Sequence, residues 1–224
     1  MAFKNILLSG LILGLFGVAG ALLVSGTESQ TREIIVHNER MALLNQLYEL
    51  VPQAEIDNDF LAHPLTLDAP EFLGISDTPA YLGVRHGELA AIVFEATIPN
   101  GYAGPILMLV AVDSSGALKG VRVVSHSETP GLGDKVELER SDWVLSFNGK
   151  SLGNPDESRW KVKKDGGVFD QFTGATVTPR AIVDSVRKVL LYFDKEHQAL
   201  FERYLEESGG PGRKVALAAT ENHS

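Results

Sequence analysis

The chain opens with an uninterrupted apolar segment. Residues 6–24 are 19 consecutive uncharged residues, most of them Leu, Ile, Val, Gly or Ala. At about 1.5 Å of rise per residue, a helix of this length nearly matches a bilayer core. The pattern predicts one transmembrane helix at about residues 6–24, within an N-terminal segment of residues 1–27. A cleavable signal peptide is the alternative, because 19–21 are small residues, but the apolar run continues past them through Val24.

Two later segments have apolar residues at helical spacing. Residues 28–52 contain Ile35, Met41, Leu44 and Leu47 and no Gly or Pro before Pro52. We predict a membrane-proximal helix there. A second long helix is predicted after Thr178-Pro179, through Leu205, with Thr178 as its N-cap and Pro179 at its first position.

Alternating and β-branched residues fill the region between these helices. Residues 80–85 and 89–97 flank one turn, and residues 106–113 and 118–125 flank another, which predicts two antiparallel hairpins. Two shorter apolar runs, 143–147 and 160–162, are candidates for additional strands. Residues 52–79 are rich in turn formers and are predicted to be irregular.

These elements define an α+β fold. A single N-terminal transmembrane helix precedes one mixed, mainly antiparallel sheet domain flanked by long helices. We place the domain at residues 53–207, after the membrane-proximal helix of residues 28–52. Residues 208–224 begin Ser-Gly-Gly-Pro-Gly and have no apolar period, so they are predicted to be a disordered tail.

The amino-acid composition excludes several kinds of functional site and partner. It has no cysteine, which excludes disulfides, thiol nucleophiles and cysteine-ligated metal clusters. The 20 basic and 29 acidic residues give a formal net charge of -9, and no basic cluster is present, which argues against a nucleic-acid partner. The histidines show no metal-ligand spacing, so no metal site is expected.

The charges are unevenly placed around the apolar segment. Lys4 is the only charged side chain before Glu28, so the remaining 197 residues carry a net charge of -10. The positive-inside tendency then predicts a cytoplasmic N-terminus and a periplasmic domain in an inner membrane. Small residues recur on one stripe of the apolar helix, at Gly10, Gly14, Gly17 and Ala21. The stripe is either a contact with another membrane helix or the ordinary abundance of glycine in such helices.

Two glycine-containing segments are candidates for ligand binding. Residues 125–135, Ser-His-Ser-Glu-Thr-Pro-Gly-Leu-Gly-Asp-Lys, follow a predicted strand and are either an ordinary turn or a ligand loop. Residues 170–179 place Gly174 and Ala175 just before a predicted helix start, where backbone N–H groups and the helix dipole favour an anion. A phosphate held there by amides or esterified to Thr173 or Thr176, and a plain capped helix start, both fit this pattern.

The amino-acid sequence of the second segment is distinctive. Asp-x-x-Thr-Gly-Ala-Thr at 170–176 resembles the acceptor motif of covalently flavinylated proteins, in which a flavin transferase moves FMN from FAD onto the last threonine as a phosphoester. Together with Ser-Glu-Thr-Pro-Gly-Leu-Gly at 127–133 and one membrane helix, it resembles the G subunits of Rnf (Rsx) ion-translocating electron-transport complexes. The resemblance runs from the membrane helix to about Leu205.

The resemblance implies a role for each matching residue. Thr176 would carry covalent FMN, and Asp170 would belong to the transferase recognition motif. The other cofactor-binding residues implied are Thr173, Gly174, Ala175, Glu128, Thr129, Gly131 and Leu132. Phe172, Trp143 and Trp160 are either core residues or walls for the flavin ring, and His126 either bonds the flavin or is solvated.

The implied function is electron transfer without an independent substrate. The chain would be a redox component of a translocase that couples electron flow between NADH and ferredoxin to ion transport, with no catalytic residue of its own and FMN supplying the chemistry. Its partners would be the membrane, the other subunits and a flavin transferase. The C subunit of sodium-pumping NADH:quinone reductase is one alternative, although its chains are usually longer. A membrane-tethered binding or assembly module without flavin is another.

Overall fold

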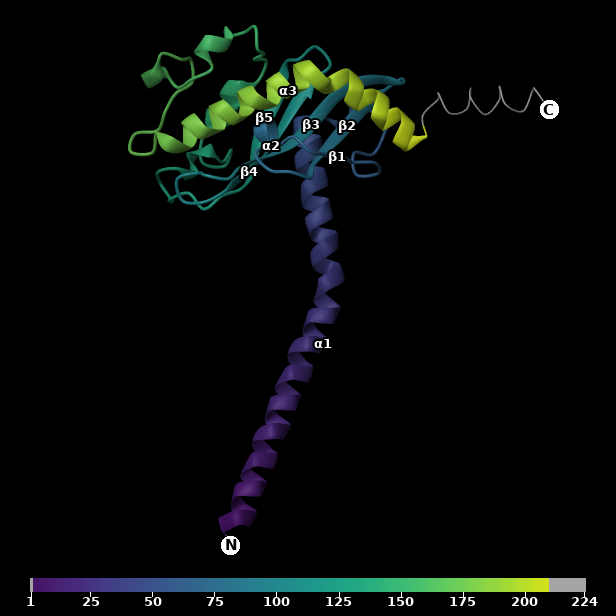
Figure 1. The fold of residues 1–224 in the computed structure, drawn as a ribbon, viewed down its shortest axis with the longest axis vertical. Helices are drawn as coiled ribbons and strands as arrows, with labels where there is room; N and C mark the ends of the chain where they lie inside the picture. The colour runs from purple at the N-terminus through teal and green to yellow at the C-terminus, as the bar shows by residue number, and fades with distance from the viewer. Residues whose placement is uncertain (1, 210–224) are drawn as a thin grey trace, which may run out of the picture. The chain divides into compact units, whose positions relative to one another are not determined.

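The computed structural model describes residues 2–209, so the predicted tail lies outside the described residues from residue 210 onward (Figure 1). The chain divides into two compact units, Met1–Asn45 and Gln46–Ser224. The division falls inside the first helix, α1 (Ala2–Leu50), which joins the predicted transmembrane and membrane-proximal segments into one continuous element. The helix continues because the change from apolar to charged residues near residue 27 includes no proline, and Pro52 is the first.

The first unit contains the apolar part of α1. Leu8–Ser25 is long and apolar enough to cross a membrane, and none of this window is buried within the protein. An 18-residue apolar helix with every side chain exposed is unfavourable in water, so its composition favours a lipid environment. The chain therefore has one candidate single-pass anchor in its described residues, near the N-terminus.

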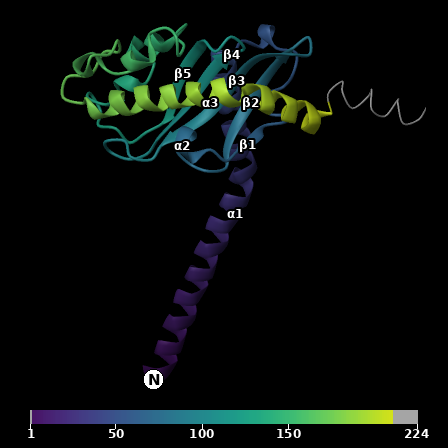
Figure 2. The same ribbon diagram turned by 45° about the horizontal axis from the view of Figure 1, so that its top comes forward.

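The second unit is built on a five-stranded antiparallel sheet with strand order β1-β2-β3-β4-β5 (Figure 2). Its strands are β1 (Leu65–Leu67), β2 (Thr78–Arg85), β3 (Glu88–Ile98), β4 (Ile106–Asp113) and β5 (Leu118–Ser125). The four predicted strands and the α+β class are confirmed. The region predicted to be irregular also contains η1 (Gln53–Glu55), β1 and α2 (Pro70–Leu73), so that prediction is partly wrong.

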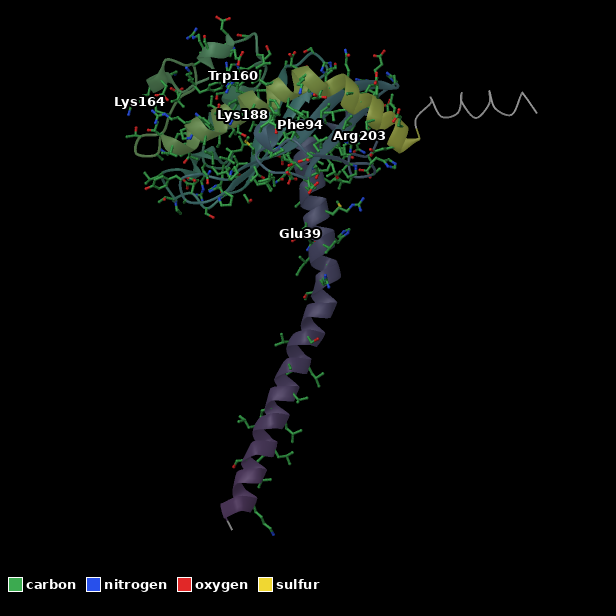
Figure 3. All side chains as sticks on the ribbon, in the orientation of Figure 1. Glu39, Phe94, Trp160, Lys164, Lys188 and Arg203 are labelled. Atoms are coloured by element: carbon green, nitrogen blue, oxygen red, sulfur yellow. The ribbon has the colours of Figure 1, made fainter. Side chains whose placement is uncertain are left out.

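Helix α3 (Val177–Ser208) lies across one face of the sheet (Figure 2). Alternate strand residues such as Ile92, Phe94 and Val110 are fully buried in the core that α3 completes. Phe94, labelled in Figure 3, meets Phe193 of α3 edge to face, with ring centroids 6.4 Å apart. Because the apolar residues of α3 recur near every 3.6 positions, they form one stripe that packs on this face.

The opposite face of the sheet packs against the end of α1 and the segment after it. Leu47, Leu50 and Val51 are buried, and glycines on the strands allow close approach. A Cβ on Gly120 of β5 would lie 2.8 Å from Leu50 Cδ2, and one on Gly83 of β2 would lie 2.7 Å from Ile56 Cγ2. The last turn of α1 is therefore part of the domain core.

The chain between β5 and α3 contains short 3-10 helices: η2 (Asp134–Val136), η3 (Asp142–Phe147), η4 (Glu157–Arg159) and η5 (Lys163–Asp165). The strands predicted at 143–147 and 160–162 are wrong. The aromatic residues of these runs pack on one another instead of lining a sheet edge. Phe147 and Phe169 stack with centroids 4.6 Å apart, and Trp143 meets Phe172 at 5.2 Å.

A core contribution from α1 predicts a specific loss of stability. Leu47→Ala removes a fully buried side chain and should lower the free energy of unfolding by about 3 kcal/mol. The measurement is denaturant unfolding of the full chain in detergent, followed by the fluorescence of the buried residues Trp143 and Trp160. Ile35→Ala on the same helix is the control, because Ile35 is exposed. Equal effects of the two substitutions would contradict this packing.

Candidate functional site

The two glycine-containing segments meet at one small cavity beside the start of α3. The cavity has a volume of about 110 Å³. Its lining residues are Tyr102 from the β3–β4 loop, Glu128, Thr129, Leu132 and Gly133 from the loop after β5, and Gly174, Ala175, Thr176 and Val177 at the start of α3. Segments far apart in the sequence thus form one pocket.

Thr176 occupies the N-cap position of α3. Its side chain makes no capping hydrogen bond, and the residue is half-buried in the pocket lining. Helix α3 begins at Val177, two residues before the predicted start, so Pro179 lies at the third helical position. The prediction that Thr178 is the N-cap is therefore wrong. Proline is tolerated in the first turn because N–H groups there have no intrahelical partner.

The Thr178 hydroxyl instead bonds to a buried acid. Glu128 is 4% exposed, and its Oε2 accepts a hydrogen bond from Thr178 Oγ1 at 2.5 Å. Its Oε1 accepts one from the Ala103 N–H at 3.1 Å. Gly133 makes room for this side chain, because a Cβ there would lie 2.7 Å from Glu128 Oε2. Glu128 therefore ties together the three segments that line the pocket.

The other residues of the first motif have different positions. Thr129 and Leu132 line the pocket, whereas Gly131 does not. Gly131 has φ +79°, and the Thr129 carbonyl accepts hydrogen bonds from the Leu132 and Gly133 N–H groups, both at 3.1 Å. Gly131 thus permits the tight turn that brings Leu132 to the pocket.

The second motif also divides into pocket and surface residues. Gly174 and Ala175 line the pocket, but Thr173 is exposed and lies outside the lining. Asp170 is exposed, and its carboxylate pairs with Lys163 at 2.6 Å. Phe172, like Trp143 and Trp160, is buried in the aromatic core and does not line the pocket. Of the two alternatives for these three aromatic residues, the structure supports the core.

Sequence reasoning identified Leu132 but missed the other two apolar residues at the rim of the pocket, Tyr102 and Val177. Tyr102 is 70% exposed, Val177 47% and Leu132 42%. Three large apolar side chains are thus exposed around one small cavity, whereas most others of this kind in the second unit are buried. The signal available was an aromatic residue beside glycine in Gly101-Tyr102-Ala103-Gly104, which is too common to identify a site. Exposed apolar groups gathered at a pocket are typical of a binding surface.

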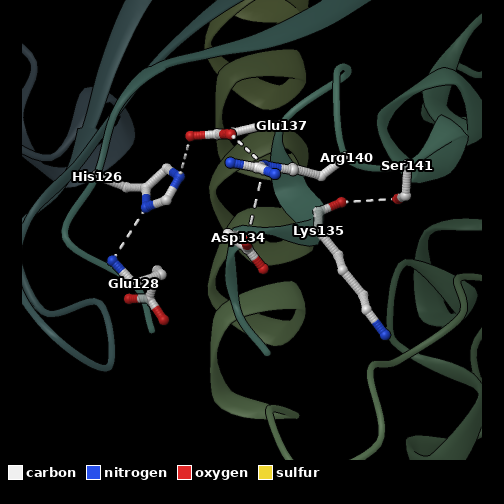
Figure 4. A network of polar contacts seen from close by, with 7 residues as sticks. All are labelled: His126, Glu128, Asp134, Lys135, Glu137, Arg140 and Ser141. Carbon is white, nitrogen blue, oxygen red and sulfur yellow. Dashed lines mark hydrogen bonds and ion pairs between the residues drawn. The ribbon is translucent and has the colours of Figure 1, made fainter. Parts of the chain in front are cut away.

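His126 is neither solvated nor a pocket residue. Its side chain is 8% exposed, and both ring nitrogens have protein partners (Figure 4). Nε2 lies 2.8 Å from Glu137 Oε1, and Nδ1 accepts a hydrogen bond from the Glu128 N–H at 3.0 Å. Arg140 continues the network to Glu137 at 3.5 Å and to Asp134 at 3.8 Å. The loop that carries Glu128 is therefore also held by polar contacts that do not involve Thr178 or Ala103.

A larger cavity, of about 730 Å³, lies along another side of α3 and includes Trp160, Arg180 and Arg187. Its arginines already have carboxylate partners. Arg180 donates two hydrogen bonds to Asp165, at 2.5 and 2.7 Å, and its guanidinium holds the pKa of the Asp165 carboxyl below the ordinary value. Arg187 pairs with Glu157 and Asp184. Both guanidinium groups of this cavity are thus paired, and neither glycine-containing motif contributes to its lining, so the pocket at Thr176 is the better candidate site.

The donors at the Thr176 pocket suit a phosphate, and its rim suits an apolar ring. The first turn of α3 supplies the Val177 and Thr178 N–H groups, which have no intrahelical partners, and the positive end of the helix dipole. The cavity is smaller than the roughly 300–1,000 Å³ usual for an enclosed small-molecule site. A flavin nucleotide held here would therefore have only part of its surface enclosed. Among the side chains that the structure describes, no group of His, Asp and Glu has the geometry of a metal site.

Comparison with known protein families shows which domains the chain contains. Residues 101–191, which include both motifs, match the model of the FMN-binding domain. Residues 1–50 match the model of the RnfG N-terminal region. The chain therefore has the FMN-binding domain of a flavoprotein, preceded by one apolar helix long enough to cross a membrane.

Its relatives identify the family. The chain is 46% identical over 208 residues to the G subunit of the ion-translocating oxidoreductase complex of Pseudomonas aeruginosa, covering 92% of this chain and 96% of the relative. The G subunits of the same complex from Vibrio atlanticus and Shewanella loihica are 43% and 42% identical over 201 residues, with 90% and 89% of this chain and 96% and 95% of the relatives covered. The chain belongs to the family of G subunits of the Rnf ion-translocating oxidoreductase complex.

The Glu128–Thr178 contact predicts a matched pair of substitutions. Thr178→Val leaves the buried Glu128 Oε2 without its donor and should lower the free energy of unfolding by about 2 kcal/mol. Thr173→Val should change it by less than about 0.5 kcal/mol, because Thr173 is exposed. Denaturant unfolding of the full chain in detergent measures both values. A small effect of Thr178→Val would argue against a buried, hydrogen-bonded Glu128.

Proposed function

We propose that this chain is the membrane-anchored electron-transfer component of an ion-translocating oxidoreductase complex and carries FMN as a phosphoester of Thr176. One observation carries the proposal. Thr176, the last threonine of the acceptor motif, has a hydroxyl that makes no capping bond and lies in the pocket that both motifs line. The match to the FMN-binding domain and the family of the relatives support the cofactor and the complex.

The attachment of FMN to Thr176 would be a group transfer in which no atom changes its oxidation state. Thr176 Oγ1 forms a bond to the phosphorus of the FMN half of FAD, the pyrophosphate bond breaks, AMP leaves, and the hydroxyl proton is released. A separate flavin transferase is the partner that performs this step. The Val177 and Thr178 N–H groups, with the helix dipole, would stabilise the phosphodiester charge beside Thr176.

The remaining residues of the pocket would hold and orient the cofactor. Tyr102, Leu132 and Val177 offer apolar surface to the ring, and Thr129, Thr173, Gly174, Ala175 and Gly131 shape the two turns beside it. Glu128 would fix the loops, because each of its oxygens accepts a hydrogen bond from a different segment. FMN supplies exchange of electrons singly or in pairs. No side chain of this protein is required as a nucleophile during turnover.

The small volume of the pocket supports a relay rather than an enclosed reaction. A ring that is only partly enclosed stays accessible to electron carriers in other subunits of the complex. In the proposed complex, electron flow between NADH and ferredoxin is coupled to ion transport. The domain lies in the periplasm and the N-terminus in the cytoplasm, as Lys4 and the positive-inside tendency favour.

Flavin attachment tests the proposal directly. The full chain, expressed with an active flavin transferase, should gain the mass of one FMN ester and keep flavin fluorescence on a denaturing gel. Thr176→Val should abolish both signals without unfolding the chain, because the Thr176 hydroxyl makes no capping bond. Thr66→Val is the control and should load fully, because Thr66 is an exposed residue of β1 that lies outside both motifs. A wild-type chain without flavin would refute the redox role, and full loading of Thr176→Val would place the ester elsewhere.

The orientation can be tested cleanly because the chain has no cysteine. We expect the Ser158→Cys variant to react with a membrane-impermeant maleimide in whole Gram-negative cells with a permeable outer membrane, since Ser158 is exposed in the domain. The Ala2→Cys variant should react only after lysis. The reverse pattern would put the domain in the cytoplasm.

A further inference from the structure

The hydrogen bonds of His126 specify its protonation state. The Glu128 N–H is a donor, so Nδ1 must carry a lone pair to accept from it at 3.0 Å. The proton of the neutral ring therefore lies on Nε2, which donates to Glu137 Oε1 at 2.8 Å. With a second proton, Nδ1 would become a donor facing the Glu128 N–H. The contact exists only while the imidazole is neutral.

The residue held by this contact organises the pocket. The Glu128 backbone is fixed by His126, and its carboxylate accepts hydrogen bonds from Thr178 of α3 and Ala103 of the β3–β4 loop. Tyr102 and Val177 are the direct neighbours of these two donors in the chain, and both line the pocket. A shift of the Glu128 backbone would therefore displace pocket walls on both sides.

The charged groups around His126 all lie within residues 128–140 (Figure 4). Glu137 bonds the ring directly, and Arg140 bridges Glu137 and Asp134. Glu128 lies on the loop of His126 itself. The formal charges of Glu137, Asp134 and Arg140 sum to one negative charge, so a protonated imidazole would meet an oppositely charged network. Asp134 Oδ1 is buried without a hydrogen-bond partner in the described part of the chain.

We propose that His126 is a positioning residue of the flavin site, which fixes the Glu128 loop only in its neutral, Nε2-protonated form. Proton uptake by His126 releases the Glu128 N–H and loosens the pocket. The position of the flavin in its site thereby depends on the pH of the compartment that contains the domain. The part of this role that concerns the flavin builds on the proposed function, whereas the hold of His126 on Glu128 does not.

The first experiment uses the full chain in detergent micelles without flavin. Long-range proton–nitrogen NMR should find that the neutral ring carries its proton on Nε2 and none on Nδ1. As the imidazole titrates, the protection of the Glu128 amide against hydrogen exchange should fall by about tenfold, the effect of losing one hydrogen bond. This measurement on the wild-type chain does not depend on any variant folding. An Nδ1-protonated ring, or protection of Glu128 that is independent of pH, would overturn the proposal.

Two substitutions at His126 separate the contacts of its two nitrogens. His126→Asn keeps an acceptor near the Nδ1 position and does not titrate, so Glu128 should stay protected at every pH. His126→Gln keeps a donor toward Glu137 and lacks that acceptor, so protection should be low throughout. His86→Asn is the control, because His86 lies on an exposed turn at φ +53°, which asparagine tolerates. In the His86→Asn variant, the protection of the Glu128 amide should depend on pH as it does in the wild type.

The second experiment measures the flavin midpoint potential against pH in the flavin-carrying chain. The wild-type profile should contain an inflection where His126 titrates, and His126→Asn should lack it. Superimposable profiles would show that His126 does not position the flavin site. A wild-type chain that accepts no flavin would refute the proposed function alone, and the amide measurements would still decide whether His126 holds Glu128.

Discussion

The geometry of the pocket depends on one buried carboxylate. Glu128 is almost fully removed from water, and an unpaired buried carboxylate would be costly, so each of its oxygens must find a donor. Thr178 and Ala103 provide these donors from two different elements, and Gly133 leaves the space that the side chain needs. The need to satisfy this group holds the start of α3, the β3–β4 loop and the loop after β5 together around Thr176.

Much of the fold could be predicted from periodicity. Strands β2 to β5 and helix α3 follow from runs of Val and Ile and from apolar residues spaced near 3.6. Strand β1 was missed because its three residues lie between prolines, where local signals favour irregular structure. Residues 143–147 look like a strand by composition, but Ser141 caps a 3-10 helix there by accepting from the Trp143 N–H. Aromatic packing then takes the place of sheet pairing.

The candidate site was predictable from its two motifs but not from their contacts. Gly174 was identified because a glycine before a helix start suits an anion. Thr176 was identified by its position as the last threonine of the motif. Periodicity could not assign Thr178 to Glu128, since that bond joins residues 50 positions apart. Tyr102 and Val177 were missed for the same reason. A residue's place in a pocket depends on tertiary packing, which leaves no local pattern.

The contrast between Thr176 and Thr178 also bears on regioselectivity. These hydroxyls lie two residues apart in the chain. The Thr176 hydroxyl makes no capping hydrogen bond at the helix start, whereas the Thr178 hydroxyl donates a short hydrogen bond to the buried Glu128. A modifying enzyme that acts on the folded chain meets only one of them as an accessible nucleophile. The fold itself would then discriminate between neighbouring acceptors, and the enzyme would need to recognise little more than the surface around the correct hydroxyl.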